Sequence, residues 1–151
     1  FNSRNIRRKS IPDTLLAWKY FVDQLTEEEA KSCYFILHTD AVSDAGTDLP
    51  KVKDYIFGKN YNNVLLSTSK VPAEHLNYYY NLADAQILLS SAEGWGLALT
   101  EALLTGTPII ANVTGGMQNQ MRLIVIFLLT IREHIKNMVN GHSQYSQITV
   151  H

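Results

Sequence analysis

Cysteine is almost absent from this sequence of 151 residues, which contains a single one, Cys33. One cysteine cannot form an internal disulfide, so the hydrophobic core has to hold the fold. Hydrophobic residues make up 46% of the chain, which is enough for the core of one ordinary domain. Cys33 stands at the head of the apolar run 33–39, so we expect a buried thiol in a reducing compartment, the cytoplasm.

A long hydrophobic run is also missing. The longest one, residues 123–131, has nine residues, whereas a helix that crosses a bilayer needs about 20. Residues 1–10 are polar and basic and lack the apolar stretch of a signal peptide. We therefore expect no membrane span. Because the chain begins at Phe1 without an initiator methionine, in what reads as a strand, we expect it to be a piece of a longer protein.

Neither sign of charge is in excess, since 13 Lys and Arg oppose 14 Asp and Glu and the net charge is -1. This balance gives no global attraction to nucleic acid or to an anionic membrane, so any anion site must be local. The five histidines include no pair at metal-ligand spacing, so we expect no metal site. His38 ends a predicted strand, and its side chain either belongs to the core or faces a ligand cleft.

Strand and helix patterns alternate along the chain with short connections. Helical spacing occurs in 13–25, in 73–83 and in a segment that begins near Trp95 or Gly96, and short apolar runs typical of strands occur in 33–39, 63–68, 84–90 and 107–112. The runs 33–39 and 63–68 do not alternate, so we expect both of their faces to be covered. Parallel neighbours need a helical crossover, so the predicted fold class is α/β, a Rossmann-like doubly wound parallel sheet with helices on both faces. Ligands bind such sheets beyond the carboxyl ends of the strands.

One helix carries an unusual combination of residues around its start. Glu93 is followed by Gly94 and Gly96, and Glu101 is the one charge within the apolar segment 95–104. The unpaired amides of a helix N-terminus bind anions, and glycines leave room for a phosphate. A carboxylate, a row of amides and a second carboxylate match the hydroxyls, phosphates and hydroxyls of a nucleoside diphosphate linked to a sugar.

The spacing leaves a second interpretation open, in which Leu97, Glu101 and Thr105 form the solvent-facing stripe of this helix. A buried carboxylate would need a polar partner, because burying it unpaired is costly. Gly94 and Gly96 do not belong to the signature of a dinucleotide-binding site, because the sequence contains no G-x-G-x-x-G motif.

The longer segment SAEGWGLALTEALLTGTPIIANVTGG, residues 91–116, resembles the signature of the retaining glycosyltransferases of family 4, the group 1 family with the GT-B fold. In that signature a Glu, seven intervening residues and a second Glu precede a Gly-x-Pro, a strand and a Gly-Gly turn. The matching residues here are Glu93, Glu101, Gly106, Pro108, Gly115 and Gly116. The upstream segment 78–91 is similar to the stretch that leads into the signature.

The basic opening is similar to the Arg and Lys element of the same family, which contacts the diphosphate of the donor. Arg4 and Lys9 stand at the matching positions. Their charges could neutralise a diphosphate leaving group without a metal. The alternative is that this segment is a solvated basic end, and we interpret Arg7 and Arg8 in that way.

The resemblance implies a role for each matching residue. Glu93 would hold hydroxyls of the donor sugar, and Glu101 would hold the ribose. The amides of Trp95, Gly96 and Leu97 would meet the phosphates, beside Gly94. Val71 would lie where the backbone reads the base. The donor would be a UDP- or GDP-sugar, the sugar would be transferred to an acceptor hydroxyl with retention, and no cofactor is expected.

The resemblance covers residues 1–121, which would form a nucleotide-sugar-binding domain, the C-terminal half of a GT-B enzyme. Residues 122–151 depart from the family and form a divergent segment. The acceptor-binding N-terminal domain is missing, so we expect little or no transfer by this chain alone. Two alternatives stay open: a non-catalytic module that binds a nucleotide or phospho-sugar, and a different α/β fold in which the two glutamates are incidental.

Overall fold

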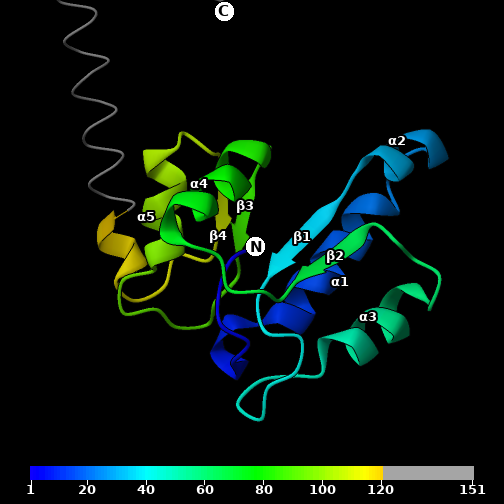
Figure 1. Ribbon diagram of the computed structural model, residues 1–151, viewed down its shortest axis with the longest axis horizontal. Coiled ribbons are helices and arrows are strands. Elements are labelled where there is room, and N and C mark those ends of the chain that lie inside the picture. Colours follow the sequence, from blue (N-terminus) through cyan, green and yellow to red (C-terminus); the bar gives the residue numbers. More distant parts are fainter. Residues whose placement is uncertain (121–151) are drawn as a thin grey trace, which may run out of the picture. The chain divides into compact units, whose positions relative to one another are not determined.

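The computed structural model describes residues 1–120 (Figure 1). The chain divides into two units, of which the first, Phe1–Met117, is compact and contains helices α1 to α5 and strands β1 to β4. The predicted divergent segment 122–151 lies outside the described residues.

In chain order the elements are the 3-10 turn η1 (Arg7–Lys9), α1 (Ile11–Val22), α2 (Glu27–Ser32), β1 (Phe35–His38), α3 (Leu49–Phe57), β2 (Val64–Ser67), α4 (Ala73–Leu82), β3 (Gln86–Leu88), α5 (Leu97–Leu104) and β4 (Ile109–Ala111).

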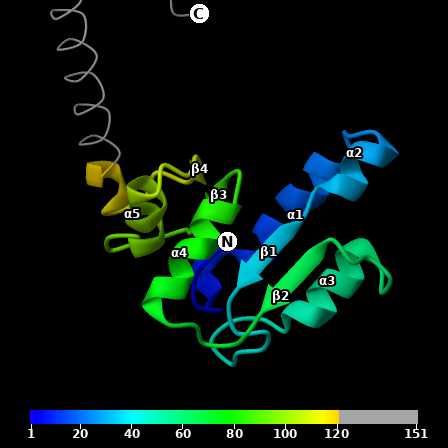
Figure 2. The same cartoon turned by 45° about the horizontal axis from the view of Figure 1, so that its top comes forward.

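The four strands pair in parallel, two by two. β1 pairs with β2 and β3 pairs with β4, and a helix connects the strands of each pair. Asn2 forms a parallel bridge to His38, so the start of the chain runs alongside β1. Figures 1 and 2 show this end of the chain between the two pairs. The parallel strands and their connecting helices confirm the α/β class, although the described strands form two separate ladders rather than one continuous sheet.

The first pair is covered mainly on the face toward α1. Phe35 and Leu37 are buried on this face, and Trp18 of α1 stacks on Phe35 with 5.2 Å between ring centroids. On the other face Leu65 is 44% exposed. The prediction that both faces are covered is therefore wrong for β2, because an apolar run does not reveal how many layers pack against it. Cys33, predicted to be buried, is only partly buried because it lies at the end of α2 rather than inside β1.

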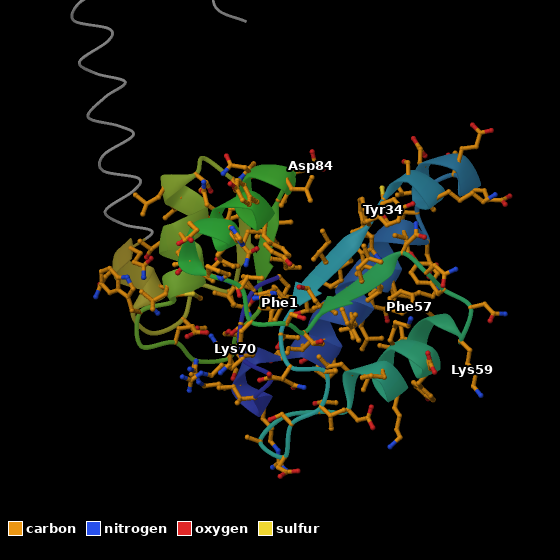
Figure 3. All side chains as sticks on the ribbon, viewed as in Figure 1. Phe1, Tyr34, Phe57, Lys59, Lys70 and Asp84 are labelled. Carbon is orange, nitrogen blue, oxygen red and sulfur yellow. The ribbon has the colours of Figure 1, made fainter. Side chains whose placement is uncertain are left out.

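The core draws apolar side chains from both strand pairs. Phe1 lies at their junction (Figure 3), and its amino group donates to the Ile36 carbonyl at 2.9 Å. The most deeply buried large apolar residues are Ile11, Leu15, Leu37, Leu49, Leu88, Leu99 and Met117. They come from α1, β1, α3, β3, α5 and the residue directly after the Gly-Gly turn 115–116, so burial links elements that are distant in sequence.

The apolar patterns do not predict α2 or α3, and both begin at a side-chain cap. Thr26 and Glu29 form a reciprocal capping box at the start of α2. The carboxylate of Asp48 accepts a hydrogen bond from the Lys51 amide at 3.1 Å at the start of α3. These helices have 6 and 9 residues, and local caps rather than a long apolar period define them.

Candidate functional site

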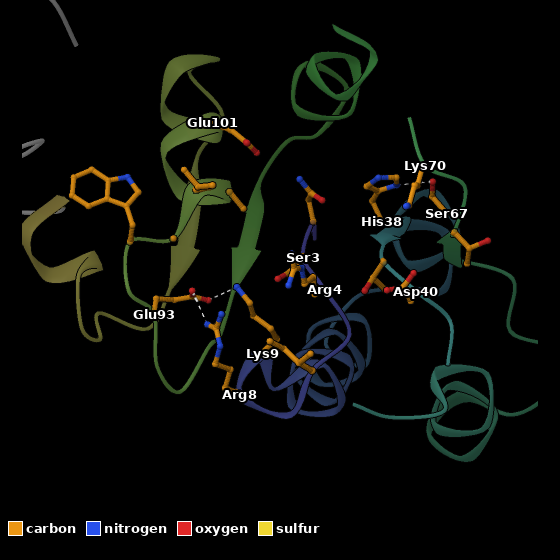
Figure 4. A pocket seen from close by; sticks show the side chains of 18 of the residues that line it. Ser3, Arg4, Arg8, Lys9, His38, Asp40, Ser67, Lys70, Glu93 and Glu101 are labelled. Atoms are coloured by element: carbon orange, nitrogen blue, oxygen red, sulfur yellow. Dashed lines mark hydrogen bonds and ion pairs between the residues drawn. The ribbon is translucent and has the colours of Figure 1, made fainter. Parts of the chain in front are cut away.

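A cavity of about 670 Å³ opens at the carboxyl ends of β1, β2 and β3 (Figure 4). Its lining residues come from within segments 2–9, 38–40, 67–70 and 93–101, which are far apart in sequence. This edge of the strands is where the α/β fold predicts a ligand. Of the predicted site residues, the cavity lining includes Arg4, Lys9, Glu93, Gly94, Trp95, Gly96, Leu97 and Glu101.

Val71 is the predicted site residue that does not line the cavity. The lining ends one residue earlier, at Lys70, on the loop that follows β2. The chain then turns into α4, whose N-cap residue is Pro72. The predicted loop is therefore at the cavity and lines it as far as Lys70, and the role of the Val71 backbone stays a prediction.

The turn between Glu93 and α5 is supported from behind by the glycine pair 115–116. The Gly116 amide donates to the Glu93 carbonyl at 2.9 Å. A Cβ atom on Gly116 would lie 1.7 Å from the Gly94 carbonyl oxygen, so only glycine permits this approach. The two glycine-containing segments of the sequence signature are thus in direct contact.

Gly94 and Gly96 serve different purposes in this turn. A Cβ on Gly94 would meet no atom within 4 Å, so the space beside this residue is open. Gly96 has a φ of 84°, a left-handed conformation that favours glycine, and a Cβ there would lie 3.0 Å from Met117. The absence of a side chain at Gly96 therefore makes room for Met117, whereas its absence at Gly94 leaves open space next to the cavity.

Helix α5 begins directly after this turn, with Gly96 as its N-cap residue and no side-chain cap. The amides of the first residues of a helix have no partner within the helix. Leu97 and Ala98 occupy these positions and both line the cavity. The positive end of the helix dipole and its amides thus lie at the cavity, an arrangement that suits an anion.

The Glu93 carboxylate accepts hydrogen bonds from two basic side chains of the N-terminal segment, Arg8 and Lys9. Arg8 Nη1 donates to Glu93 Oε2 at 2.8 Å, and Lys9 Nζ forms a hydrogen-bonded ion pair with Oε1. Glu93 and Lys9 are buried, with 7% and 8% exposure. Burial by itself would raise the pKa of Glu93, but hydrogen bonds from Lys9, Ser90 and Arg8 and the charge of Lys9 outweigh it and hold the pKa below its ordinary value.

Arg8, predicted to be a surface residue, belongs to this site. Besides pairing with Glu93 it donates to the Ala92 carbonyl at 2.7 Å, and it lines the cavity. Its neighbour Arg7 is exposed and does not line the cavity. Four of the six residues 4–9 are basic, and their spacing in the sequence does not distinguish Arg7 from Arg8. The 3-10 turn η1, which contains both, decides which side chain faces Glu93.

The basic segment is held in place by a buried asparagine. The Asn5 side chain donates to the carbonyls of Asp40 and Thr47 at 3.0 Å and 2.6 Å and accepts from the Thr47 amide at 3.0 Å. Asn5 is 2% exposed. These bonds anchor the residues on both sides of Asn5, including Arg4 in the cavity lining, to the loop that follows β1.

Glu101 has the polar partner that a carboxylate on an apolar helix requires. The Tyr80 hydroxyl donates to Glu101 Oε2 at 2.6 Å, and the same hydroxyl accepts from Asn2 Nδ2 at 2.9 Å. Glu101 is half-buried and lines the cavity, whereas Leu97 is 69% exposed. The interpretation of Glu101 as part of a purely solvent-facing stripe is therefore wrong, since a partner from α4 lies opposite it.

His38 is partly buried and lines the cavity, so it faces the cleft rather than belonging to the core. Its Nδ1 is 3.0 Å from the Ser67 hydroxyl, which is 2.8 Å from the Tyr79 hydroxyl, and the His38 ring lies 5.0 Å from the Tyr79 ring. His38 and Ser67 also line the cavity (Figure 4). Tyr79 and Tyr80 thus support lining residues from behind, whereas Tyr78 is 67% exposed. In residues 1–120 no cluster of three His, Cys, Asp or Glu side chains is arranged to hold a metal.

The cavity thus brings together a glycine turn, the N-terminus of a helix that follows a parallel strand, and two carboxylates, as in ligand sites of the α/β class. The described helices include none that is long and apolar enough to span a membrane. The family model for glycosyl transferases group 1 matches residues 40–126, more than half of the chain. The chain therefore belongs to the group 1 glycosyl transferase family.

Two curated proteins are similar to part of the chain. Trehalose synthase from Pyrococcus horikoshii is 34% identical over 65 residues, which are 42% of this chain and 16% of that protein. D-inositol 3-phosphate glycosyltransferase from Geodermatophilus obscurus is 30% identical over 83 residues, which are 54% of this chain and 18% of that protein. The matched segment thus spans less than a fifth of the length of these relatives.

Proposed function

We propose that this chain forms the donor-binding half of a retaining glycosyltransferase that transfers a sugar from a nucleoside-diphosphate sugar to an acceptor hydroxyl. The observation that carries the proposal is the convergence of the glycine turn 93–96, the α5 N-terminus and the basic segment 4–9 on one cavity that also contains Glu101. Membership in the group 1 family agrees with glycosyl transfer as the chemistry.

The proposed role of the basic segment is to stabilise the leaving group. The diphosphate would lie against the first amides of α5, with Arg4, Arg8 and Lys9 beside it. Negative charge develops on the diphosphate as the bond to the sugar breaks, and fixed donors at that position stabilise this charge most. Because cationic side chains and a helix dipole supply the positive charge, the proposal requires no metal.

The proposed role of the two glutamates is to bind hydroxyls. Arg8 and Lys9 keep Glu93 ionised, and an ionised carboxylate accepts hydrogen bonds from sugar hydroxyls through its remaining lone pairs. Glu101 would accept from the ribose in the same way. Glu93 would thus orient the sugar and is not proposed as a proton donor, because its lowered pKa keeps it deprotonated at neutral pH.

The acceptor is not part of the proposal, since the names of the two relatives, trehalose synthase and D-inositol 3-phosphate glycosyltransferase, do not point to one common acceptor. The matched segment spans less than a fifth of each relative, and we propose that a separate acceptor-binding domain completes the active site, so this chain binds a donor nucleotide but transfers little or nothing by itself.

Isothermal titration calorimetry with UDP, GDP and ADP tests the proposal. We expect saturable binding of at least one nucleotide, and a loss of about tenfold in affinity for Glu101→Ala, which removes hydrogen bonds to a charged group. Glu74→Ala is the matched control, because Glu74 is an exposed carboxylate outside the cavity lining. If none of the three nucleotides binds, the donor site is refuted. Robust transfer by the chain alone would refute the requirement for a separate acceptor domain.

A further inference from the structure

We propose that Tyr80 is the positioning residue for Glu101, so that its buried hydroxyl fixes the carboxylate that meets the ribose hydroxyls of the donor. The inference rests on the proposed function and deepens it by adding a residue that does not line the cavity. Tyr80 belongs to α4, and Glu101 belongs to α5.

The hydroxyl of Tyr80 stands in the middle of a directed chain of hydrogen bonds. It accepts from Asn2 Nδ2 at 2.9 Å and donates to Glu101 Oε2 at 2.6 Å. Asn2 and Glu101 both line the cavity, whereas Tyr80 is 3% exposed and lies behind them. The bond from Asn2 occupies the acceptor side of the hydroxyl, so its single proton is directed to Glu101.

Tyr80 is itself held rigidly. Its main-chain carbonyl accepts from the Thr107 hydroxyl at 2.9 Å, and Thr107 is buried. Burial and the hydrogen bond to Glu101 raise the pKa of the Tyr80 hydroxyl, so it stays protonated and can donate at neutral pH. A tyrosine also has few rotatable bonds, so its hydroxyl is a better-defined anchor than a flexible side chain.

The hydrogen bond leaves the other oxygen of Glu101 available. Oε2 receives the Tyr80 proton, and within residues 1–120 Oε1 has no protein hydrogen-bond donor. Glu101 lies one turn after Leu97 on α5, and both residues line the cavity. Because the Tyr80 hydroxyl holds Oε2, the orientation of the Glu101 carboxylate is defined, and Oε1 can accept a hydrogen bond from one of two neighbouring ribose hydroxyls.

The alternative is that Tyr80 only fills the core. Its ring packs in either case, so the two roles differ in what the hydroxyl does and not in what the ring does. Tyr80→Phe removes the hydroxyl and keeps the ring. Tyr78→Phe is the matched control on the same helix, because Tyr78 is 67% exposed and outside the cavity lining.

The experiment compares three ligands by calorimetry: UDP, 2',3'-dideoxy-UDP and inorganic pyrophosphate, with the nucleotide that binds best replacing UDP if necessary. We expect Tyr80→Phe to weaken UDP about 3- to 10-fold, the range for losing the fixed orientation of one side chain. Binding of dideoxy-UDP and pyrophosphate should stay unchanged, since neither has the ribose hydroxyls. Tyr78→Phe should leave the binding of all three ligands unchanged.

A second variant keeps the inference testable if Tyr80→Phe does not fold, as judged by circular dichroism. Asn2→Ala removes the donor to the Tyr80 hydroxyl and should produce the same selective loss for UDP. If Tyr80→Phe leaves the UDP affinity unchanged, or weakens the binding of pyrophosphate as much as that of UDP, the positioning role is refuted. Neither result would refute the proposed donor site. Absence of nucleotide binding by the unaltered chain overturns the proposed function and this inference together.

Discussion

Replacing Lys9 by Met removes one of the two cations that hold Glu93. The side chains of Lys9 and Glu93 are 11% and 4% exposed, so this ion pair is largely buried. Methionine fills nearly the same volume and can lie in the same direction, so the change removes charge rather than packing. The variant isolates the electrostatic contribution of Lys9 to the glycine turn that begins at Glu93.

The expected loss of stability is about 2 to 3 kcal/mol. Breaking a buried ion pair by removing one partner costs roughly 3 to 5 kcal/mol, because the other charge remains buried without compensation. Here Arg8 still pairs with Glu93 Oε2 at 2.8 Å, so the loss should lie below that range. The exposed pair of Lys31 and Glu27 provides a control, and Lys31→Met should not change the stability measurably.

The loss should depend on pH in a defined direction. The folded-state pKa of Glu93 lies below its ordinary value of 4.5, so the ionised group stabilises the unaltered chain above that pH. This contribution disappears as the pH falls through the folded-state pKa. Without Lys9, burial has less opposition and the pKa of Glu93 rises. The carboxylate of the variant then protonates more readily in acid, so the difference between the two chains should shrink as the pH is lowered.

Urea unfolding of both chains at about pH 7.5 and about pH 4.5 measures this difference directly. Adding Glu93→Gln to Lys9→Met should restore part of the stability, because the buried carboxylate is then neutral and the charge that loses its partner, Arg8, has a side chain that is 45% exposed to solvent. A loss that is the same at both pH values would refute the reasoning. So would a double variant less stable than Lys9→Met alone, because either result would mean that the charge of Glu93 is not what destabilises the single variant.

Two further predictions concern the neighbours of this ion pair. Gly116→Ala places a Cβ 1.7 Å from the Gly94 carbonyl oxygen and should destabilise the chain by about 1 to 3 kcal/mol in urea unfolding. Gly94→Ala meets no protein atom within 4 Å, so it should keep its stability but weaken UDP binding in calorimetry; equal stability losses would contradict the packing argument. Arg8→Ala should weaken UDP and pyrophosphate alike, whereas Arg7→Ala should change neither, and an equal effect of the two would mean that η1 does not select between them.

Much of the local structure can be predicted from the sequence. Apolar runs and helical spacing predict the strands and α1, α4 and α5, because these patterns reflect which side of an element is buried. The glycines of the turn and the spacing of Glu93 and Glu101 point to the carboxyl end of β3, where the cavity lies. The short helices α2 and α3 escape this reasoning, since capping residues at 26–29 and 48–51 mark them instead.

The placement of individual site residues could not be predicted in the same way. Arg7 and Arg8 are equivalent in the sequence, and Val71 and Lys70 are adjacent on one loop. In each case one residue lines the cavity and its neighbour does not, because the direction of a short turn decides which side chain faces it.

The α/β class, the glycine turn and the two glutamates of the family signature can be recognised from the sequence alone, since each is marked by a pattern of residues close in the chain. The partners of these residues become visible only in the folded chain. Arg8 and Lys9 reach Glu93 across 85 and 84 positions, and Tyr80 reaches Glu101 from a different helix. Hydrogen bonds and ion pairs of this kind join elements that are distant in the chain, and the periodicity of an element tells which face is buried but not which side chain lies opposite.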